Sequence, residues 1–330
     1  MAGKMIGIEV GSDTVKMVLL SNGQVKQMAI QQLPENLVRE GRVTSPDAMA
    51  NFLKEMRKHY HIPGGNAALV LSPRTVLAHR VSMPMMSQQQ LELNLPFEFR
   101  DFVGQDGAKY HYDYAMMDTK KTGDGQSDQL ELFAAAARKE LLESWHTIFR
   151  KAGLTLKIAV PAEMAWLNLV RQAKNAPKEL CILDIGYSST FVYIYADGKF
   201  MMGKEIEMGG QLLDETIAAE LQIDPRTART YKENNMNGVL GLDCCVNAYN
   251  ALAVEVLKAL NFYGYENREN NLQDIYYCGG TAILEPLRMA VLKNTHMVLH
   301  HIDRLIPDSE EEMEPVTLRC ALAAAAASQR

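Results

Sequence analysis

Two distant segments of the chain share one arrangement: a carboxylate, an aliphatic residue and a glycine in a row, followed by hydroxyl side chains. The first segment contains Glu9, Gly11, Ser12, Asp13, Thr14 and Lys16. The second contains Asp184, Gly186, Ser188, Ser189 and Thr190. A glycine at a tight turn lets backbone N–H groups approach an anion, and serine or threonine hydroxyls add further donors. The pattern therefore predicts two phosphate-binding turns.

The charged residues of these segments predict a phosphate ligand that carries a metal ion. Glu9 and Asp184 are acceptors suited to Mg²⁺, either directly or through its water ligands. The ammonium group of Lys16 can reach a phosphate as a point charge. The alternative is that each segment is an ordinary β-hairpin whose glycine only serves the turn. The repetition of the whole pattern favours the phosphate interpretation.

Pairs of strands must position these residues. Apolar residues lead into each glycine and leave each hydroxyl-rich turn, and Asn22-Gly23 and Asp197-Gly198 then form two-residue hairpin signals, each beginning eleven residues after the glycine. Third strands are predicted over 24–30 and 199–206. Two hairpins with matched spacing predict two halves of similar build that face one shared ligand.

Two further glycine pairs predict backbone that faces a ligand. Gly209 and Gly210 precede an amphipathic helix, and exposed amides at such an N-terminus attract a phosphate or a ribose. A short helix that follows carries Lys232, which we expect at the same site. The second pair, Gly279 and Gly280, follows a buried strand and is followed by Thr281. A turn at the end of a buried strand suits the nucleoside end of a nucleotide.

Composition limits the class of protein. The 330 residues are enough for two domains, and 47% apolar with 22% charged residues is ordinary for a soluble globular chain. A net charge of −6 argues against nucleic-acid binding. The five cysteines form no C-x-x-C pair, which predicts free thiols in a reducing compartment. No apolar run reaches the length of a membrane span, so we expect a cytoplasmic protein.

The motifs resemble those of the actin and Hsp70 ATPase superfamily. Its first phosphate loop resembles 9–16, its second resembles 184–190, and its adenosine motif resembles 278–282. Within the superfamily the chain is similar to the PilM family, the cytoplasmic actin-like components of type IV pilus assembly on the FtsA branch. The segments that carry this resemblance are 95–98, 112–114, 135–140, 152–154, 209–210, 260–263 and 318–323.

The resemblance implies an α/β, actin-like ATPase fold with two ribonuclease-H-like halves and an FtsA-type inserted subdomain. Four subdomains are expected, with the inserted one in the first half. They are 1A (1–77, 159–180 and 314–330), 1C (78–158), 2A (181–220 and 268–313) and 2B (221–267).

The resemblance also implies a function. ATP and Mg²⁺ would lie in the cleft between the halves, with Mg²⁺ held by Glu9 and Asp184. The expected nucleotide-binding residues are Gly11, Ser12, Asp13, Thr14, Lys16, Gly186, Ser188, Ser189, Thr190, Gly209, Gly210, Lys232, Gly279, Gly280 and Thr281. A scaffold of this kind would dock the N-terminal cytoplasmic peptide of a PilN-like inner-membrane protein between the inserted subdomain and the first half. It would thus be peripheral to the inner membrane through that partner, and self-association is open.

Three departures from the superfamily pattern bear on activity. Glu9 stands where Asp is usual, and Thr281 replaces a smaller residue. The strand 132–137 contains no Gln or Glu, where superfamily ATPases with fast turnover place a water-positioning residue. Without that group the rate of ATP hydrolysis should be lower by a factor of about 10²–10⁴, so we expect ATP binding with slow or absent hydrolysis.

Two other functions remain open. An FtsA-like protein would form filaments on membranes, but the tail 315–327 lacks the basic and aromatic faces of a membrane-surface helix. A small-molecule kinase of the same fold would need a carboxylate base beside the substrate hydroxyl. Asp106, followed by a glycine, is the nearest candidate, and we expect it in a surface loop.

Overall fold

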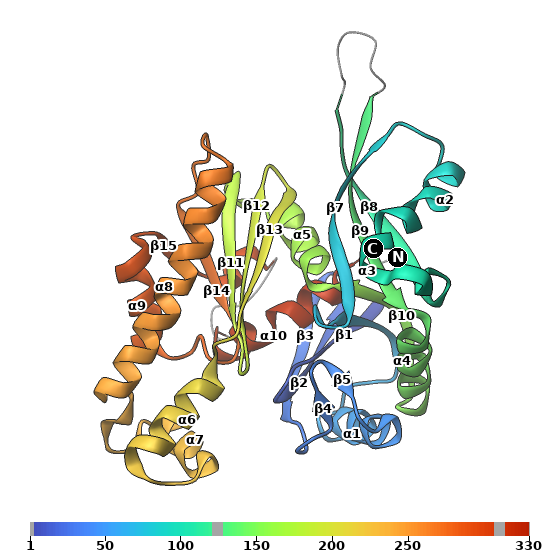
Figure 1. The fold of residues 1–330 in the computed structure, drawn as a ribbon. Coiled ribbons are helices and arrows are strands. Elements are labelled where there is room, and N and C mark those ends of the chain that lie inside the picture. Colours follow the sequence, from blue (N-terminus) through green and yellow to red (C-terminus); the bar gives the residue numbers. More distant parts are fainter. Residues whose placement is uncertain (1–2, 121–127, 307–313, 330) are drawn as a thin grey trace.

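Two five-stranded sheets form the body of the molecule. The computed structural model describes residues 3–120, 128–306 and 314–329. The strand orders are β10-β6-β1-β2-β3 and β13-β12-β11-β14-β15. In each sheet the first three strands along the chain are antiparallel neighbours and the last two are parallel to the first. The predicted pair of similar halves is therefore confirmed, and Figure 1 shows them side by side.

The predicted hairpins are present in both sheets. The first sheet consists of β1 (Lys4–Val10), β2 (Thr14–Ser21), β3 (Gln24–Gln32), β6 (Gly65–Leu71) and β10 (Leu154–Pro161). The second consists of β11 (Glu179–Ile185), β12 (Thr190–Ala196), β13 (Lys199–Ile206), β14 (Asp274–Cys278) and β15 (Val298–His301). Asn22 and Asp197 both have positive φ, 54° and 48°, as do the glycines after them. Two-residue hairpin turns of type I′ need this conformation.

Helices cover the outer faces of the sheets, and two helices lie between the halves. On the first half α1 (Pro46–His59) packs against α4 (Lys139–Lys151). The second half carries α6 (Gly210–Leu221), α7 (Pro225–Glu233), α8 (Asp243–Glu266) and α9 (Glu285–Thr295). Between the halves, α5 (Ala162–Gln172) packs against α10 (Glu314–Ala327) (Figure 1).

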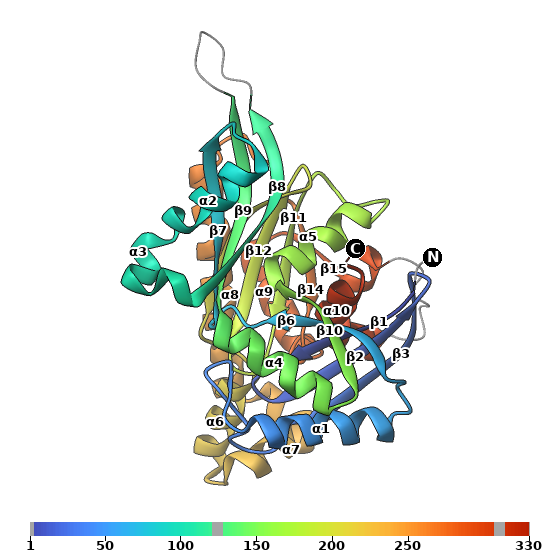
Figure 2. The ribbon, with the colours of Figure 1, turned by 90° about the vertical axis from the view of Figure 1, so that its right-hand side faces the viewer.

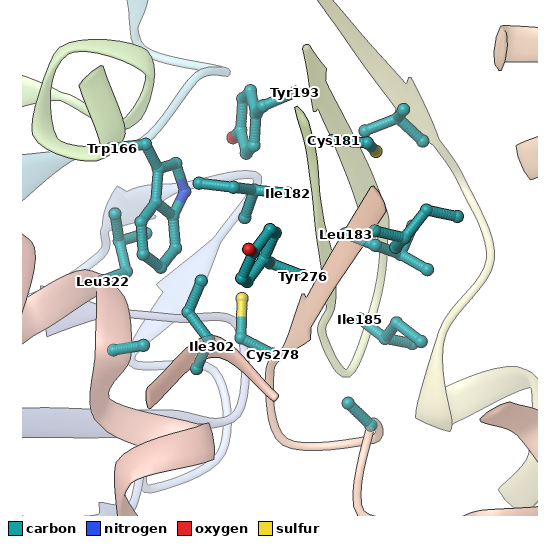
Figure 3. Packing of buried hydrophobic residues seen from close by; sticks show 14 of the residues in the cluster. Trp166, Cys181, Ile182, Leu183, Ile185, Tyr193, Tyr276, Cys278, Ile302 and Leu322 are labelled. Atoms are coloured by element: carbon teal, nitrogen blue, oxygen red, sulfur yellow. The ribbon is translucent and has the colours of Figure 1, made fainter. Parts of the chain in front are cut away.

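Helix α10 joins the two cores. One of its faces packs into the core of the second half and includes Leu318 and Leu322. The opposite face, which includes Cys320 and Ala323, packs on Val18 and Leu20 of β2. Its alanines keep the helix thin enough to lie between two sheets. Figure 3 shows Trp166 of α5 and Leu322 of α10 facing side chains of the second sheet such as Ile182.

A small three-stranded sheet is inserted into the first half. Its order is β7-β9-β8, with β7 (Val76–Pro84), β8 (Tyr110–Lys120) and β9 (Gln129–Arg138) all antiparallel. Helices α2 (Gln88–Glu98) and α3 (Arg100–Val103) and a 3₁₀ turn, η1 (Gly104–Lys109), lie between its first two strands along the chain. Figure 2 shows this unit projecting from the body.

Two segments near the expected subdomain limits pack with the large sheets. Residues 139–158 were assigned to subdomain 1C, but α4 and β10 pack with the first five-stranded sheet and α1. Residues 243–266 were assigned to 2B, but α8 packs against β13, α6 and α9 and belongs to the core of the second half. Both helices bury an apolar face on a large sheet, which decides their position more strongly than sequence proximity does.

Two expectations about the class of protein can be compared with the fold. All five cysteines are free, and four of them are buried. Among the helices within residues 3–120, 128–306 and 314–329, none has the length and apolarity that crossing a membrane requires.

Candidate nucleotide-binding site

The two predicted phosphate turns have the same backbone geometry. In the first, the Gly11 N–H donates to the Thr14 carbonyl at 2.9 Å, and in the second the Gly186 N–H donates to the Ser189 carbonyl at 2.9 Å. The preceding carboxylates, Glu9 and Asp184, hold equivalent positions, each two residues before its glycine. The sequence pattern therefore corresponds to a structural repeat.

The carboxylates of the two halves approach each other. Burial and the nearby charge of Glu9 together raise the pKa of Asp184 to about 7, although the charge of Lys16 opposes both. Glu9 and Lys16 are cross-strand neighbours, and their side chains form an ion pair while only 14% and 11% exposed. Burial works against the charge on Lys16, but Glu9 and Asp184 outweigh it and raise its pKa. Lys16 thus pairs with the carboxylate of its own half and also interacts electrostatically with Asp184 of the other half.

This carboxylate pair suits Mg²⁺. Mg²⁺ is usually bound by one or two carboxylates, with phosphate oxygens and waters completing an octahedron. In the part of the chain that the structure describes, no three His, Cys, Asp or Glu side chains gather as an all-protein metal site needs. Glu9 and Asp184 would therefore hold the ion together with a phosphate ligand.

The third turn is attached directly to the second phosphate turn. The Thr281 N–H donates to the Ile185 carbonyl at 2.9 Å, and its hydroxyl donates to the Gly186 carbonyl at 2.7 Å. A Cβ on Gly279 would lie 2.4 Å from the Ile185 carbonyl oxygen, so only glycine fits between the ends of β11 and β14. By contrast, a Cβ on Gly280 would meet no atom within 4 Å. Gly280 therefore faces open space, as the predicted nucleoside contact requires.

The start of α6 also packs on the second turn. The Gly210 N–H donates to the Gly186 carbonyl at 3.1 Å, and the next amide donates to the Tyr187 carbonyl at 2.8 Å. These two amides were expected to bind a phosphate or ribose, but in this structure they hold the turn. A Cβ on Gly209 would lie within 2.6 Å of both carbonyl oxygens, which explains the glycine.

Lys232 has a structural role in this arrangement. Its ammonium lies 2.6 Å from a carboxylate oxygen of Asp214 and donates to the Gly210 carbonyl at 2.8 Å. The two side chains are 8% and 1% exposed. Burial raises the pKa of Asp214, and Lys232 partly offsets the shift. The pair fixes α7 against α6, and a contact between Lys232 and a nucleotide remains a prediction.

The predicted hydroxyl groups divide into two sets. Thr190 is fully buried and donates to the Met208 carbonyl at 2.8 Å. Ser189 is buried, donates to Glu205 at 2.7 Å and accepts from Arg74 at 3.0 Å. Three other hydroxyl residues of the two phosphate turns are more exposed and accessible to a ligand. They are Ser12, Thr14 and Ser188.

Arginine–carboxylate pairs connect the halves around the turns, and sequence reasoning missed them. Arg229 of α7 binds Asp13 with both terminal nitrogens, at 2.5 and 2.8 Å. Arg74, just after β6, lies 2.7 Å from Glu205 of β13. Asp13 was predicted as a nucleotide ligand, but its carboxylate is occupied by this guanidinium. The partners are 216 residues apart along the chain for the first pair and 131 for the second, so no local signal marks them.

One inference about hydrolysis loses its basis. The strand 132–137, which lacks Gln and Glu, is part of β9 in the inserted sheet and belongs to neither sheet that carries a phosphate turn. A different carboxyl group, that of Glu163 in the first turn of α5, is partly buried. Its Oε2 has no hydrogen-bond partner among the described residues, and burial raises its pKa.

A cavity of about 240 Å³ lies between the inserted sheet and the first half. The inserted sheet contributes His111 and Asp113 from β8 and the alanines opposite them on β9, Ala137 and Ala135. The first half contributes residues 156–159 of β10. Because successive side chains of a strand point to opposite faces, a cavity lined by four consecutive residues lies along the strand edge. β10 is an edge strand, and none of the strands in the described residues pairs with that edge.

Comparison with known proteins agrees with this fold. The chain is similar over 99% of its length to the structure of a PilM–PilN type IV pilus biogenesis complex, covering 98% of that chain, with 20% identity and a TM-score of 0.83. It is also similar to the ethanolamine utilization protein EutJ from Carboxydothermus hydrogenoformans (15% identity, 98% and 90% covered, TM-score 0.62). A third similar structure is MreB5 of Spiroplasma citri bound to ADP (13% identity, 92% and 94% covered, TM-score 0.52).

No curated protein sequence matches the chain. The family model for the type IV pilus assembly protein PilM matches residues 7–309, which is most of the sequence. The chain therefore belongs to the PilM family of type IV pilus assembly proteins, with the actin-like ATPase fold.

Proposed function

We propose that the protein is an ATP-binding scaffold of a type IV pilus assembly platform, cytoplasmic and bound to the inner membrane through a partner. The observation that carries the proposal is a pair of equivalent glycine turns, one in each half, whose charged residues Glu9, Lys16 and Asp184 interact electrostatically across the halves. The MreB5 structure, which has the same fold, was solved with ADP bound.

In this proposal the accessible groups of each turn bind the phosphates. The N–H groups of Ser12 and Ser188 and the hydroxyls beside them would donate to phosphate oxygens. Mg²⁺ would neutralise phosphate charge, held by Glu9 and Asp184. Gly280 would contact the nucleoside, because its Cα faces open space. Since ligands from both halves are involved, nucleotide binding would shift the angle between them.

Thermal unfolding with and without millimolar ATP and Mg²⁺ tests nucleotide binding. A ligand at about 100 times its Kd adds about 2.7 kcal/mol, a shift of several degrees for a chain of this size. Asp184→Ala should abolish the shift while the ligand-free variant remains folded. An unchanged shift in this variant would refute the metal assignment.

We propose further that the cavity beside β10 docks the N-terminal cytoplasmic peptide of a PilN-like inner-membrane protein. A free strand edge beside apolar side chains suits an extended peptide, whose backbone would pair with the edge. The similar PilM–PilN complex supports a partner of this kind. The position of the cavity between the inserted sheet and the first half supports this proposal.

Fluorescence anisotropy with a labelled copy of that peptide tests the docking site. Ala135→Trp fills the cavity and should weaken binding at least about tenfold, since a well-packed contact contributes more than 1 kcal/mol. Ala48→Trp on the exposed side of α1 is the matched control and should have no effect. Equal affinities for both variants would place the peptide elsewhere.

The two other functions have less support. The tail helix α10 is buried between the halves and is not placed to lie on a membrane. Asp106, the candidate kinase base, lies in η1 on the inserted unit, where Lys109 pairs with it at 2.8 Å. That position is on the surface and remote in the fold from the two glycine turns.

A further inference from the structure

Arg229 contacts the tips of both phosphate turns. Its two terminal nitrogens bind the carboxylate of Asp13, which lies between the hydroxyl residues of the first turn. Its guanidinium also lies 5.2 Å from the ring centre of Tyr187, which follows the glycine of the second turn. The side chains of Arg229 and Asp13 are only 21% and 14% exposed. Arg229 therefore lies at the place where the two turns face each other.

The position of Asp13 is unusual for a phosphate-binding turn. A carboxylate has no proton to donate to a phosphate at neutral pH, and its charge repels one. The Arg229 guanidinium, in contrast, is a planar fork that fits a carboxylate and a phosphate equally well. Its third nitrogen, Nε, pairs with Glu233 at 2.9 Å and fixes the orientation of the fork. The two terminal nitrogens, which face the turns, are therefore the ones that donate hydrogen bonds to Asp13.

We propose that Arg229 is a phosphate-binding residue, held by Asp13 when the site is empty and released to the triphosphate when ATP binds. This inference rests on the proposed nucleotide site. Since Asp13 belongs to the first half and Arg229 to the second, the exchange breaks a direct connection between the halves. Nucleotide binding is thereby coupled to the angle between them.

The chain contains a matched control on the same helix. Arg226 lies one turn before Arg229 and pairs with Glu35, also across the two halves. Its side chain is 79% exposed and that of Glu35 is 68% exposed, so this pair lies in solvent. Arg226→Gln removes the same charge from α7 as Arg229→Gln does, but away from the turns.

Titration calorimetry with ATP and Mg²⁺ tests the exchange in a double-mutant cycle. Arg229→Gln should weaken ATP binding roughly ten- to hundredfold, because hydrogen bonds to a charged group contribute about 1.5–3 kcal/mol. Arg229→Lys, which keeps the charge but not the planar fork, should weaken ATP binding by a smaller factor than Arg229→Gln. Arg226→Gln should leave the affinity unchanged. Asp13→Asn should strengthen ATP binding in the presence of Arg229, and should have a smaller effect in the Arg229→Gln background, where only the repulsion between Asp13 and the phosphate is removed.

Two results would overturn the inference. If Asp13→Asn strengthens ATP binding equally in both backgrounds, Asp13 acts only by repelling the phosphate. If Arg229→Gln binds ATP as the unmodified protein does, the guanidinium does not contact the ligand. Both results leave the nucleotide site intact, whereas failure of the unmodified protein to bind ATP would refute the proposed function itself. Circular dichroism of each variant without ligand verifies that it is folded.

Discussion

Two adjacent glycines allow the packing of the third turn and its ligand contact to be tested separately. Gly279 has φ +101°, and an added Cβ would lie 2.4 Å from the Ile185 carbonyl oxygen and 2.5 Å from a carboxylate oxygen of Asp184. Gly280 has neither a positive φ nor an atom within 4 Å of its added Cβ. Alanine at the two positions therefore adds the same methyl group in opposite environments.

The expected cost follows from these contacts. Holding a non-glycine residue at positive φ costs about 1–3 kcal/mol, and forcing a methyl group into a packed site costs a further 1–3 kcal/mol or so. Gly279→Ala should therefore lower the free energy of unfolding by about 3–5 kcal/mol. Gly280→Ala should change it by less than about 1 kcal/mol, because the unfolded chain alone is affected.

Urea denaturation followed by circular dichroism measures both effects. The variants should differ clearly in midpoint, with Gly280→Ala close to the unmodified protein. In ATP titrations Gly280→Ala should nevertheless bind about tenfold more weakly, because its methyl group enters the space predicted for the nucleoside. Equal denaturation midpoints for the two variants would refute the packing argument, and unaltered ATP affinity of Gly280→Ala would refute the nucleoside contact.

Three further changes have definite expected outcomes. Lys16→Met leaves two buried carboxylates without their cation and should cost about 3–5 kcal/mol in urea denaturation, with partial recovery in Mg²⁺. Burial raises the pKa of Glu163 in the folded state, so this carboxyl group should lower the stability of the unmodified protein as pH rises above about 4.3. Glu163→Gln removes this pH dependence. The difference in unfolding free energy between the variant and the unmodified protein should be small near pH 4 and grow on titration to pH 8, and a constant difference would contradict this. Thr281→Val removes the hydrogen bond to the Gly186 carbonyl and should cost about 1–3 kcal/mol by thermal denaturation, whereas Thr281→Ser should retain most of the stability.

The sequence predicted the elements that carry the site because their signals are local. Alternating apolar residues and the Asn22-Gly23 and Asp197-Gly198 turns are strong short-range signals, and both hairpins formed where expected. The partners of the site residues could not be predicted in this way, because they are distant in the chain. Arg229 and Glu233 read as an ordinary i,i+4 pair on a helix surface, and only the tertiary fold brings Asp13 to that helix.

Contacts between distant parts of the chain also determine the packing of residues 139–158 and the environment of Lys232. Residues 139–158 follow the inserted strands directly in the chain, so sequence order assigned them to the insert, but the apolar face of α4 packs on the first sheet. Lys232 was predicted to bind nucleotide beside the glycine turns, and its ammonium contacts the Gly210 carbonyl. Its burial against Asp214 depends on how α6 and α7 cross, which neither helix encodes by itself.

The position of α10 has a consequence for how the protein reaches its native state. This helix follows all ten strands of the two large sheets in chain order, yet it supplies side chains to the cores of both halves. A Cβ on Gly7 in β1 would lie 1.8 Å from the Ala323 carbonyl oxygen, so the helix backbone rests directly on the strand. During synthesis on the ribosome, both sheets therefore have an exposed apolar surface until residues 314–327 have emerged. Until this helix has formed, the exposed apolar surface makes the nascent chain prone to aggregation.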